Sequence, residues 1–327
     1  MNRRKFLSST LKIASAASCS PLFDIALRAV HAQQTSATSS SAKSPPPQVA
    51  LTMDDPRTAL DSLMRWPDAN SRILNAISSR NIRAALFVCG HRIDDSDGTK
   101  LVTAWDQAGH LICNHTYSHP AYTERTSYGD FAVDFLKNEK IIAGYHNRVP
   151  LFRYPFLKEG DTAEKRDKFR DLLKSRGYRV GHVTIDASDW YVSQRLVDRL
   201  AKEPKARIEP YRDFLVAHLL DRAAFYRQLA LEVIGRDIRH TILLHYNVLN
   251  ALVLPDVMSA FEKAGWQWID APLAFEDSVF QRAPKIVPAG ESLVWALAKE
   301  SERYEDRLRY PGEDDVYEKP KLDALKL

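Results

Sequence analysis

Residues 109–120 read Gly109-His110-Leu111-Ile112-Cys113-Asn114-His115-Thr116-Tyr117-Ser118-His119-Pro120. A glycine followed by a short apolar run predicts the end of a helix and then a buried strand. Two histidines, His115 and His119, follow the strand at once. Histidines four residues apart can bind one metal ion where the backbone is helical, and the alternative is a pair of surface histidines. The stretch therefore predicts a strand with a candidate metal site at its carboxyl end.

The same pattern recurs along the chain. Seven short apolar runs alternate with segments of helical spacing, and glycines stand at several of the junctions. Repeated strand–helix alternation indicates parallel strands joined by helical crossovers, which is an α/β fold. The predicted strands are Val49–Met53, Ala84–Cys89, Leu111–Asn114, Leu151–Tyr154, Arg179–Ile185, Thr241–Leu244 and Gln267–Ile269. The clearest predicted helices are Ser71–Arg80, Phe131–Tyr145, Thr162–Arg176 and Tyr211–Ile234.

Two adjacent carboxylates, Asp54 and Asp55, stand where the first predicted strand ends. The sequence Asp-Asp-Pro is also ordinary turn chemistry, so a solvated turn is the alternative. Two histidines and one aspartate form a metal site with open positions for water and substrate. That ligand set suits Zn²⁺, and Co²⁺, Mn²⁺ or Fe²⁺ would also fit it.

Three more polar features follow predicted strands. They are Phe152-Arg153-Tyr154-Pro155-Phe156, Asp186-Ala187-Ser188-Asp189-Trp190 and Leu243-Leu244-His245. Each is weak alone, because an arginine after a strand is usually a surface ion pair and a tryptophan is usually part of a core. In a (β/α) barrel, however, the carboxyl ends of the strands meet at one mouth, where catalytic groups collect. The five groups together therefore predict one active site.

In this order the five groups resemble the five motifs of the NodB-type polysaccharide deacetylases, carbohydrate esterase family 4. The resemblance spans residues 48–270, and the double aspartate, the HTxxH stretch and the DxxDW stretch are its specific parts. It implies a distorted, incomplete (β/α) barrel with about seven parallel strands. Members of this family act on chitin oligomers, peptidoglycan or acetylated xylan, and some relatives cleave other C–N bonds.

The resemblance also implies roles for the residues around the metal. Asp54 corresponds to the general base, and Asp55, His115 and His119 correspond to the ligands of a divalent ion. Arg153 would pair with Asp54 and orient it.

On the opposite side, the resemblance makes His245 the general acid and Asp189 the group that orients it. The backbone N–H near Phe156 would help to hold the oxyanion, while Trp190 and Leu243 would wall a small acetyl pocket. The chain departs mildly from the family pattern at Met53 and at Tyr246-Asn247. These departures, and the long segment 191–240, leave the identity of the substrate open.

The first 32 residues predict a twin-arginine-type signal peptide. Arg3 and Arg4 precede an Ala/Ser-rich apolar stretch, and Val30-His31-Ala32 is a candidate cleavage site. Lipid attachment at Cys19 is the less favoured alternative. Residues 33–47 are rich in Ser, Thr, Gln and Pro and predict a disordered linker. We therefore expect an exported protein, periplasmic or extracellular, with no stable membrane insertion after cleavage.

The charge of the chain excludes one class of partner. The formal net charge is +4, and the leader alone holds five Lys or Arg residues against one Asp. The rest of the chain is therefore neutral, and no nucleic-acid partner is expected. Residues 48–275 are predicted to form the deacetylase domain, and 276–327 a helical or extended tail. Cys89 and Cys113 lie in apolar runs and are expected to be buried thiols; a disulfide between them is the less favoured alternative.

The predicted function is a metal-dependent hydrolase that removes N-acetyl groups from an acetylated amino-sugar polymer or oligosaccharide. Loss of O-acetyl groups is a variant, because ester and amide hydrolysis pass through the same kind of intermediate. One rival is an amidohydrolase of the same superfamily acting on a small non-sugar C–N bond. The other is an inactive cell-wall-binding module, which should lack a catalytic group, whereas this chain keeps all of them.

Overall fold

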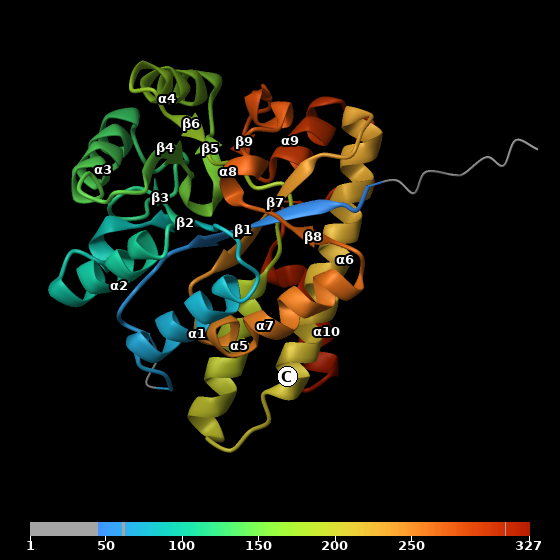
Figure 1. Cartoon of the computed structure of the whole chain (residues 1–327). Coiled ribbons are helices and arrows are strands. Elements are labelled where there is room, and N and C mark those ends of the chain that lie inside the picture. Colours follow the sequence, from blue (N-terminus) through green and yellow to red (C-terminus); the bar gives the residue numbers. More distant parts are fainter. Residues whose placement is uncertain (1–44, 61–62, 311) are drawn as a thin grey trace, which may run out of the picture. The chain divides into compact units, whose positions relative to one another are not determined.

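The computed structural model describes residues 45–60, 63–310 and 312–327, and within them seven parallel strands form one sheet (Figure 1). The strand order is β6–β4–β3–β2–β1–β7, with β8 beside β1. The predicted α/β class and the distorted, incomplete barrel are therefore confirmed. The strands are β1 (Gln48–Asp54), β2 (Ala85–Val88), β3 (Leu111–Asn114), β4 (Arg148–Phe152), β6 (Arg179–Val180), β7 (Arg239–His245) and β8 (Gln267–Trp268).

Strand β1 pairs with three other strands and is buried on both faces, as expected for a strand covered by helices. It pairs with β7 along its whole length, from Gln48 opposite Arg239 to Asp54 opposite His245. On its other edge it pairs with β8 near its start and with β2 near its end. The predicted base and the predicted acid are therefore opposite each other across one pair of strands.

The predicted strand Arg179–Ile185 is regular only at its first two residues, where it pairs with β4. The chain then passes from the β4 side to the β7 side, where Ile185 forms an isolated bridge with Ile242 of β7. Gly181 makes the crossing possible, because a Cβ there would lie 2.4 Å from Cζ of Phe87. This crossing segment is the distortion of the barrel: it joins the β4 side of the wall to the β7 side without a continuous strand.

Helices cover the sheet, and their starts follow local sequence signals. Thr162 and Ser127 cap α4 and α3 with side-chain oxygens, and Pro67 stands in the first turn of α1. Figure 1 shows α1, α5 and α7 together on one side of β1. The helices are α1 (Trp66–Ser78), α2 (Ser96–Gln107), α3 (Tyr128–Ile141), α4 (Ala163–Ser175), α5 (Asp189–Lys202), α6 (Glu209–Ile234), α7 (Val248–Lys263) and α8 (Ala271–Ala274).

A cluster of aromatic rings fixes α3 and α4 against the end of β4. Phe131 of α3 stacks on Tyr122, with ring centroids 4.2 Å apart, and packs edge-on against Phe169 of α4 at 4.7 Å. Phe152 and Tyr154, at the end of β4, complete the cluster. Rings of this size bury a large apolar area, so the cluster gives the segment after β4 a rigid base.

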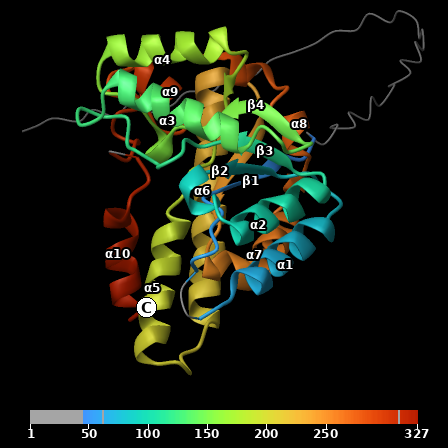
Figure 2. The ribbon, with the colours of Figure 1, turned by 90° about the vertical axis from the view of Figure 1, so that its left-hand side faces the viewer.

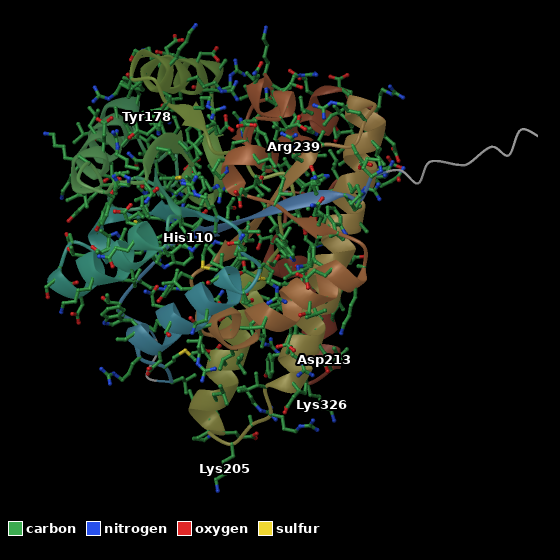
Figure 3. All side chains as sticks on the ribbon, in the orientation of Figure 1. His110, Tyr178, Lys205, Asp213, Arg239 and Lys326 are labelled. Atoms are coloured by element: carbon green, nitrogen blue, oxygen red, sulfur yellow. The ribbon has the colours of Figure 1, made fainter. Side chains whose placement is uncertain are left out.

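The segment between Trp190 and Thr241 forms two long helices, α5 and α6, as its pattern predicted. Figure 2 shows α5, α6 and the C-terminal helix running alongside one another. Lys205, in the loop between α5 and α6, points away from the barrel (Figure 3).

The last fifty residues fold against the barrel. They contain η3 (Ser278–Gln281), β9 (Ala289–Gly290), α9 (Leu293–Glu300) and α10 (Asp315–Ala324). Strand β9 pairs antiparallel with β5 (Lys158–Gly160), and η2 (Pro155–Leu157) immediately precedes β5. Pro45–Leu327 form one compact unit.

The predicted leader and most of the predicted linker lie outside the described residues, as does Cys19. Within the part of the chain that the structure describes, no helix is both long and apolar enough to cross a membrane. Cys89 and Cys113 are free and buried, in agreement with the favoured expectation.

Candidate active site

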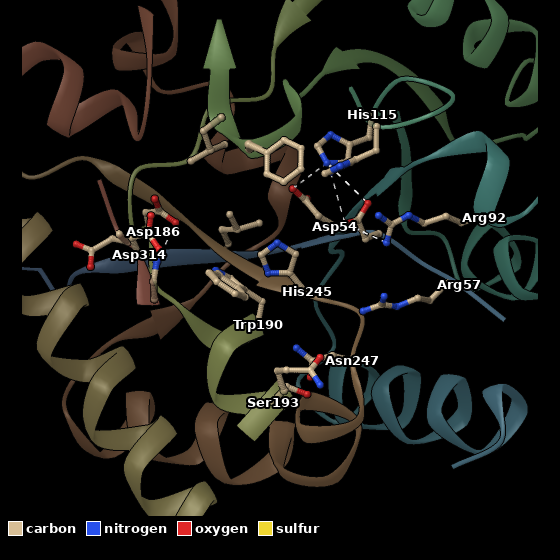
Figure 4. Close-up of a pocket in the computed structure, with 18 of the residues that line it drawn as sticks. Asp54, Arg57, Arg92, His115, Asp186, Trp190, Ser193, His245, Asn247 and Asp314 are labelled. Atoms are coloured by element: carbon tan, nitrogen blue, oxygen red, sulfur yellow. Dashed lines mark hydrogen bonds and ion pairs between the residues drawn. The ribbon is translucent and has the colours of Figure 1, made fainter. Parts of the chain in front are cut away.

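One cavity of about 570 Å³ lies at the carboxyl ends of the strands. Eight of the ten predicted site residues line it, and the other two, Arg153 and Asp189, are buried behind Asp54 and His245. Figure 4 shows His245 in the middle of this cavity, with Asp54 and His115 on one side of it. The residues that line it are Asp54, Asp55, His115, His119, Phe156, Trp190, Leu243 and His245.

The three predicted metal ligands converge. One ligand atom each from Asp55, His115 and His119 lies within 4.8 Å of the others, and among the described residues this is the one such group of three or more His, Cys, Asp or Glu. Nε2 of His119 is 3.6 Å from Oδ2 of Asp55, and Nε2 of His115 is 4.0 Å from Oδ1. The predicted ligand set is thus brought together at the end of β1 and β3.

The spacing of the two histidines led us to expect a helical backbone between them. The structure shows no helix there. The backbone after β3 is irregular, and Thr116 and His119 have left-handed φ angles of 62° and 61°. Asp55 is left-handed as well, with φ 63°. Such φ angles are uncommon for residues other than glycine. Two sharp bends therefore aim the histidines, and a third turns Asp55 away from the direction of Asp54.

The local chemistry fits a divalent cation. Nδ1 of His115 lies 2.8 Å from the backbone carbonyl of Arg153, so this nitrogen carries the proton and Nε2 presents its lone pair. Burial lowers the pKa of His115 to about 4 and that of His119 to about 3, so both rings are neutral at pH 7. Oδ1 of Asp55 is buried and has no hydrogen-bond partner among the described residues. An orphaned carboxylate oxygen beside two imidazole lone pairs needs a cation.

Arg92, at the end of η1 (Gly90–Arg92), was missed by sequence reasoning. Its Nη1 lies 3.3 Å from Oδ2 of Asp55. Burial acts to raise the pKa of Asp55, but His119, His115 and Arg92 outweigh it and hold the pKa at about 2. At pH 7 both histidines are neutral, and the charges of Arg92 and of protonated His245 still favour the ionised form of this carboxylate.

Asp54 and Arg153 form a buried ion pair, with Nη1 of Arg153 2.6 Å from Oδ1 of Asp54. The same nitrogen donates to Oγ1 of Thr52, and Nε donates to the carbonyl of Gly181. The guanidinium also lies 3.8 Å from the ring centroid of Phe87. Burial raises the pKa of Asp54 to about 6, and the charge of Arg153 limits the rise. Asp54 is therefore ionised at pH 7 and more basic than an ordinary aspartate.

Asp189 holds His245 from behind. Oδ1 of Asp189 lies 2.7 Å from Nδ1 of His245, and Oδ2 accepts from the backbone N–H of His245 at 2.9 Å. Asn247 and Asn250 also donate to Oδ2, at 3.1 and 2.6 Å. Burial alone would lower the pKa of His245, but the charge and hydrogen bond of Asp189 outweigh it and raise the pKa to about 9.

Asn250 was not predicted as a site residue, and Asn247 was noted only as a departure from the family pattern. The signal that could have found them is the spacing Asn247-x-x-Asn250 at a helix start. Asn247 caps α7 by accepting from the N–H of Asn250 at 2.8 Å. The cap places both amides beside Asp189.

The three predicted substrate-binding residues form the rim and wall. Phe156, in η2, has a left-handed φ of 56° and is 59% exposed. Its ring packs edge-on against His119, 4.6 Å between centroids. Trp190 is also partly exposed, and Leu243 is buried in the wall.

Part of the chain is similar to known proteins. Residues 41–181 match the polysaccharide deacetylase family. A peptidoglycan-N-acetylglucosamine deacetylase from Bacillus cereus is 26% identical over 146 residues, which are 44% of this chain and 46% of that protein. The chain thus matches about half the length of that relative. The family match includes Asp54, Asp55, His115, His119 and Arg153, whereas Asp189 and His245 lie beyond it.

Among solved structures, a polysaccharide deacetylase from Bacillus cereus is similar with a TM-score of 0.49 and 17% identity, over 68% of this chain and 91% of that one. A family 4 carbohydrate esterase pseudoenzyme from Bacillus anthracis is similar with a TM-score of 0.46 and 16% identity, over 70% and 65% of the two chains.

Proposed function

Because residues 41–181 match the polysaccharide deacetylase family, we propose that the chain is a metal-dependent hydrolase that removes N-acetyl groups from an amino-sugar polymer or oligosaccharide. One observation carries the proposal. A convergent Asp–His–His group lies beside the buried carboxylate of Asp54, and His245 stands opposite in the same cavity. A base, an acid and a cation site in one cavity are what hydrolysis of an amide needs.

Asp55, His115 and His119 would hold the divalent ion, and two imidazoles with one carboxylate suit Zn²⁺ best. When bound, such an ion acts as a Lewis acid that polarises the substrate carbonyl and lowers the pKa of a water molecule. The hydrogen bond from His115 to the carbonyl of Arg153 fixes the ring orientation that this role requires.

Asp54 would act as the general base. It takes a proton from the attacking water at Oδ2, since Oδ1 is occupied by Arg153. The pKa of about 6 places this carboxylate near the value that general-base catalysis favours at neutral pH. Arg153 is a positioning residue in this reading, because it contacts Asp54 and not the substrate.

His245 would act as the general acid. Its pKa of about 9 keeps the ring protonated at pH 7, and the bond from Nδ1 to Asp189 leaves Nε2 to face the cavity. An amine is a poor leaving group until it is protonated, so a proton from Nε2 completes the reaction. The backbone N–H of Phe156 would help to hold the oxyanion, with Trp190 and Leu243 around the acetyl group.

The test is acetate release by the mature, metal-loaded protein from a panel of peptidoglycan, chitin oligomers, N-acetylated exopolysaccharide and acetylated xylan. Release from an N-acetylated polymer, absent in the Asp54→Asn variant, would support the proposal. Release of acetate from xylan alone would show that the protein hydrolyses esters and not amides. A protein that is folded and metal-loaded but inactive on the whole panel would contradict it, and would favour the small-molecule amidohydrolase or the inactive binding module.

The place of action and the division of the chain belong to the same proposal. We take residues 1–32 as a signal peptide, 33–47 as a linker and 48–275 as the catalytic domain, with 276–327 as a tail that folds onto it. Cell-wall polymers lie outside the cytoplasm, so such an enzyme would act in the periplasm or beyond the cell.

A further inference from the structure

The cavity has a second, acidic end, opposite the candidate metal ligands. Four carboxylates line it, those of Asp186, Glu291, Glu313 and Asp314. Figure 4 shows Asp186 and Asp314 close together on one side of His245, with Arg57 and Arg92 on the other. Three of the four carboxylates come from the C-terminal segment, and Asp186 comes from the barrel. We call these four residues the acidic end.

Asp186 is the part of the acidic end that points to a ligand. It is only 7% exposed, and Oδ1 accepts from the backbone N–H of Ala187 at 2.9 Å. Among the described residues, nothing donates a hydrogen bond to Oδ2 and no cation pairs with this carboxylate. A buried carboxylate without a cation is costly unless a ligand supplies one.

The Lys and Arg side chains of the protein pair with only two of the four carboxylates of the acidic end. Glu313 is paired with Arg222 at 3.0 Å and Arg309 at 2.5 Å, and Glu291 is paired with Nζ of Lys158. Within the described chain, Asp186 and Asp314 form no ion pair. The acidic end therefore holds more carboxyl groups than paired protein cations, and its full ionisation needs a further positive charge.

The electrostatics agree with this surplus. Burial, with help from Glu313 and Glu291, raises the pKa of Asp186 well above its ordinary value. Burial also raises the pKa of Glu291 to about 7, and the Lys158 charge only partly offsets the rise. Both carboxylates would be stabilised in their ionised form by a positive charge placed between them.

A divalent metal ion is the weaker candidate for that charge. The group at Asp55 is the only one in the described chain whose His, Cys, Asp or Glu ligand atoms converge, so the acidic end is not arranged as a cage. An alkylammonium already occupies part of it, because Lys158 binds Glu291 there. An ammonium group needs only two or three acceptors and no fixed coordination geometry.

We propose that the acidic end binds a positively charged amino group of the substrate. The proposal rests on the proposed deacetylase function and narrows its substrate: the molecule carries a free amine as well as the acetamide that reacts. In an amino-sugar chain, such an amine belongs to a neighbouring sugar that has already lost its acetyl group. The enzyme would then continue the deacetylation of a partly deacetylated chain.

Equilibrium binding tests the ammonium site without any turnover. Calorimetry at pH 7, with the base removed by Asp54→Asn in every protein so that the acetylated sugar is not hydrolysed, would compare the unacetylated glucosamine disaccharide with its fully N-acetylated counterpart. Charge-assisted hydrogen bonds predict about 10- to 100-fold tighter binding of the amine. Asp186→Asn, which keeps the acceptor for Ala187, should lose most of this preference, and Asp314→Asn should weaken it. Asp256→Asn, on the exposed face of α7, is the matched control and should keep it.

Equal binding of the two disaccharides by the Asp54→Asn protein with an intact acidic end would overturn the inference. So would a preference that survives in both Asp186→Asn and Asp314→Asn, or displacement of the amine by Ca²⁺ or Mg²⁺ alone. Unchanged thermal unfolding of each variant would show that a loss is local.

Turnover distinguishes this inference from the proposed function. Acetate release would be measured on the mono-acetylated and the di-acetylated disaccharide, and on N-acetyl-1,4-diaminobutane. A wild-type preference of about 10-fold for the mono-acetylated sugar in kcat/KM, reduced in Asp186→Asn, would support the sugar amine. Hydrolysis of the diamine alone would support the ammonium site but would show that the bound amine belongs to a non-sugar substrate. Amine binding without any acetate release would support the site while contradicting the deacetylase proposal, and equal kcat/KM for both sugars would overturn the site alone.

Discussion

Nδ1 of His245 lies 2.7 Å from Oδ1 of Asp189, although 56 residues separate the two in the chain. Because an ionised carboxylate only accepts, the imidazole donates from Nδ1. The other oxygen of Asp189 accepts from the backbone of His245 and from Asn247 and Asn250. Four donors fix the carboxylate, and the carboxylate in turn fixes the ring.

Removing the carboxylate should change the pH profile in a defined direction. The pKa of His245, raised to about 9, predicts that kcat/KM falls as pH rises through that value. In Asp189→Asn the burial of the ring remains while its counter-charge is lost, so the alkaline limb should move to or below the value of about 6.5 that is typical of histidine. Initial rates between pH 5 and 10 would measure the shift, and an unmoved limb would contradict the role of acid.

His245→Ala should separate substrates by their leaving groups. General-acid help is typically worth about 10²–10⁴-fold, so turnover of an N-acetyl substrate should fall by that order. An activated aryl acetate, whose phenolate leaves without a proton, should be affected much less. Steady-state rates on both substrates, with metal content checked, would decide. Equal losses would leave His245 a structural or oxyanion-side group.

The adjacent aspartates should respond differently to the same change. Asp55→Asn removes a ligand charge, so the purified protein should lose its metal, as should His115→Ala. Asp54→Asn should keep the metal, because Asp54 is not one of the three converging ligands, and should lose about 10²–10⁴-fold in activity. Elemental analysis and acetate release on each variant are the measurements. An active Asp54→Asn enzyme would disprove the base assignment.

Gly181 should be sensitive to a single methyl group. A Cβ there would lie 2.4 Å from the ring of Phe87, against which Arg153 packs. Gly181→Ala should therefore lower the free energy of unfolding by about 1–3 kcal/mol, and activity should fall as Arg153 shifts. Urea denaturation would measure the change. Gly144→Ala is the control, because a Cβ at that position meets nothing within 4 Å.

The proposed export rests on residues 1–32, which lie outside the described residues. Arg3→Lys together with Arg4→Lys should leave the precursor in the cytoplasm if the leader uses the twin-arginine route. Cell fractionation with an antibody against the mature domain would locate the protein. Normal export of the double variant would indicate the general secretion route instead.

The strands were predictable because buried parallel strands are continuous apolar runs, and Leu111–Asn114 was placed to the residue. The site followed from the same logic, since polar residues directly after such runs must gather at one mouth. The prediction of one continuous strand over Arg179–Ile185 was wrong, because only Arg179–Val180 is a regular strand. Its apolar pattern says nothing of Gly181, where the close approach of the Phe87 ring decides the path.

The rest of the site depends on backbone turns and distant contacts. The left-handed φ angles of Asp55, Thr116 and His119 have no marker such as glycine in the sequence. Glu313 and Asp314 lie in a charged stretch that reads as a solvated tail, yet they line the cavity. Long-range packing of this kind leaves no local pattern in the sequence. Neither the left-handed turns nor the place of Glu313 and Asp314 in the cavity could therefore be inferred from the residues alone.

The residue-by-residue pairing of β1 with β7 sets how far apart the proposed base and acid stand. Inserting one residue into either strand would displace one group along the barrel by about 3.3 Å and turn its side chain to the opposite face. A loop insertion outside the paired residues would do neither. Natural variation in length should therefore be tolerated around the mouth of this barrel and excluded between Gln48 and Asp54 and between Arg239 and His245, even where the individual side chains are free to change.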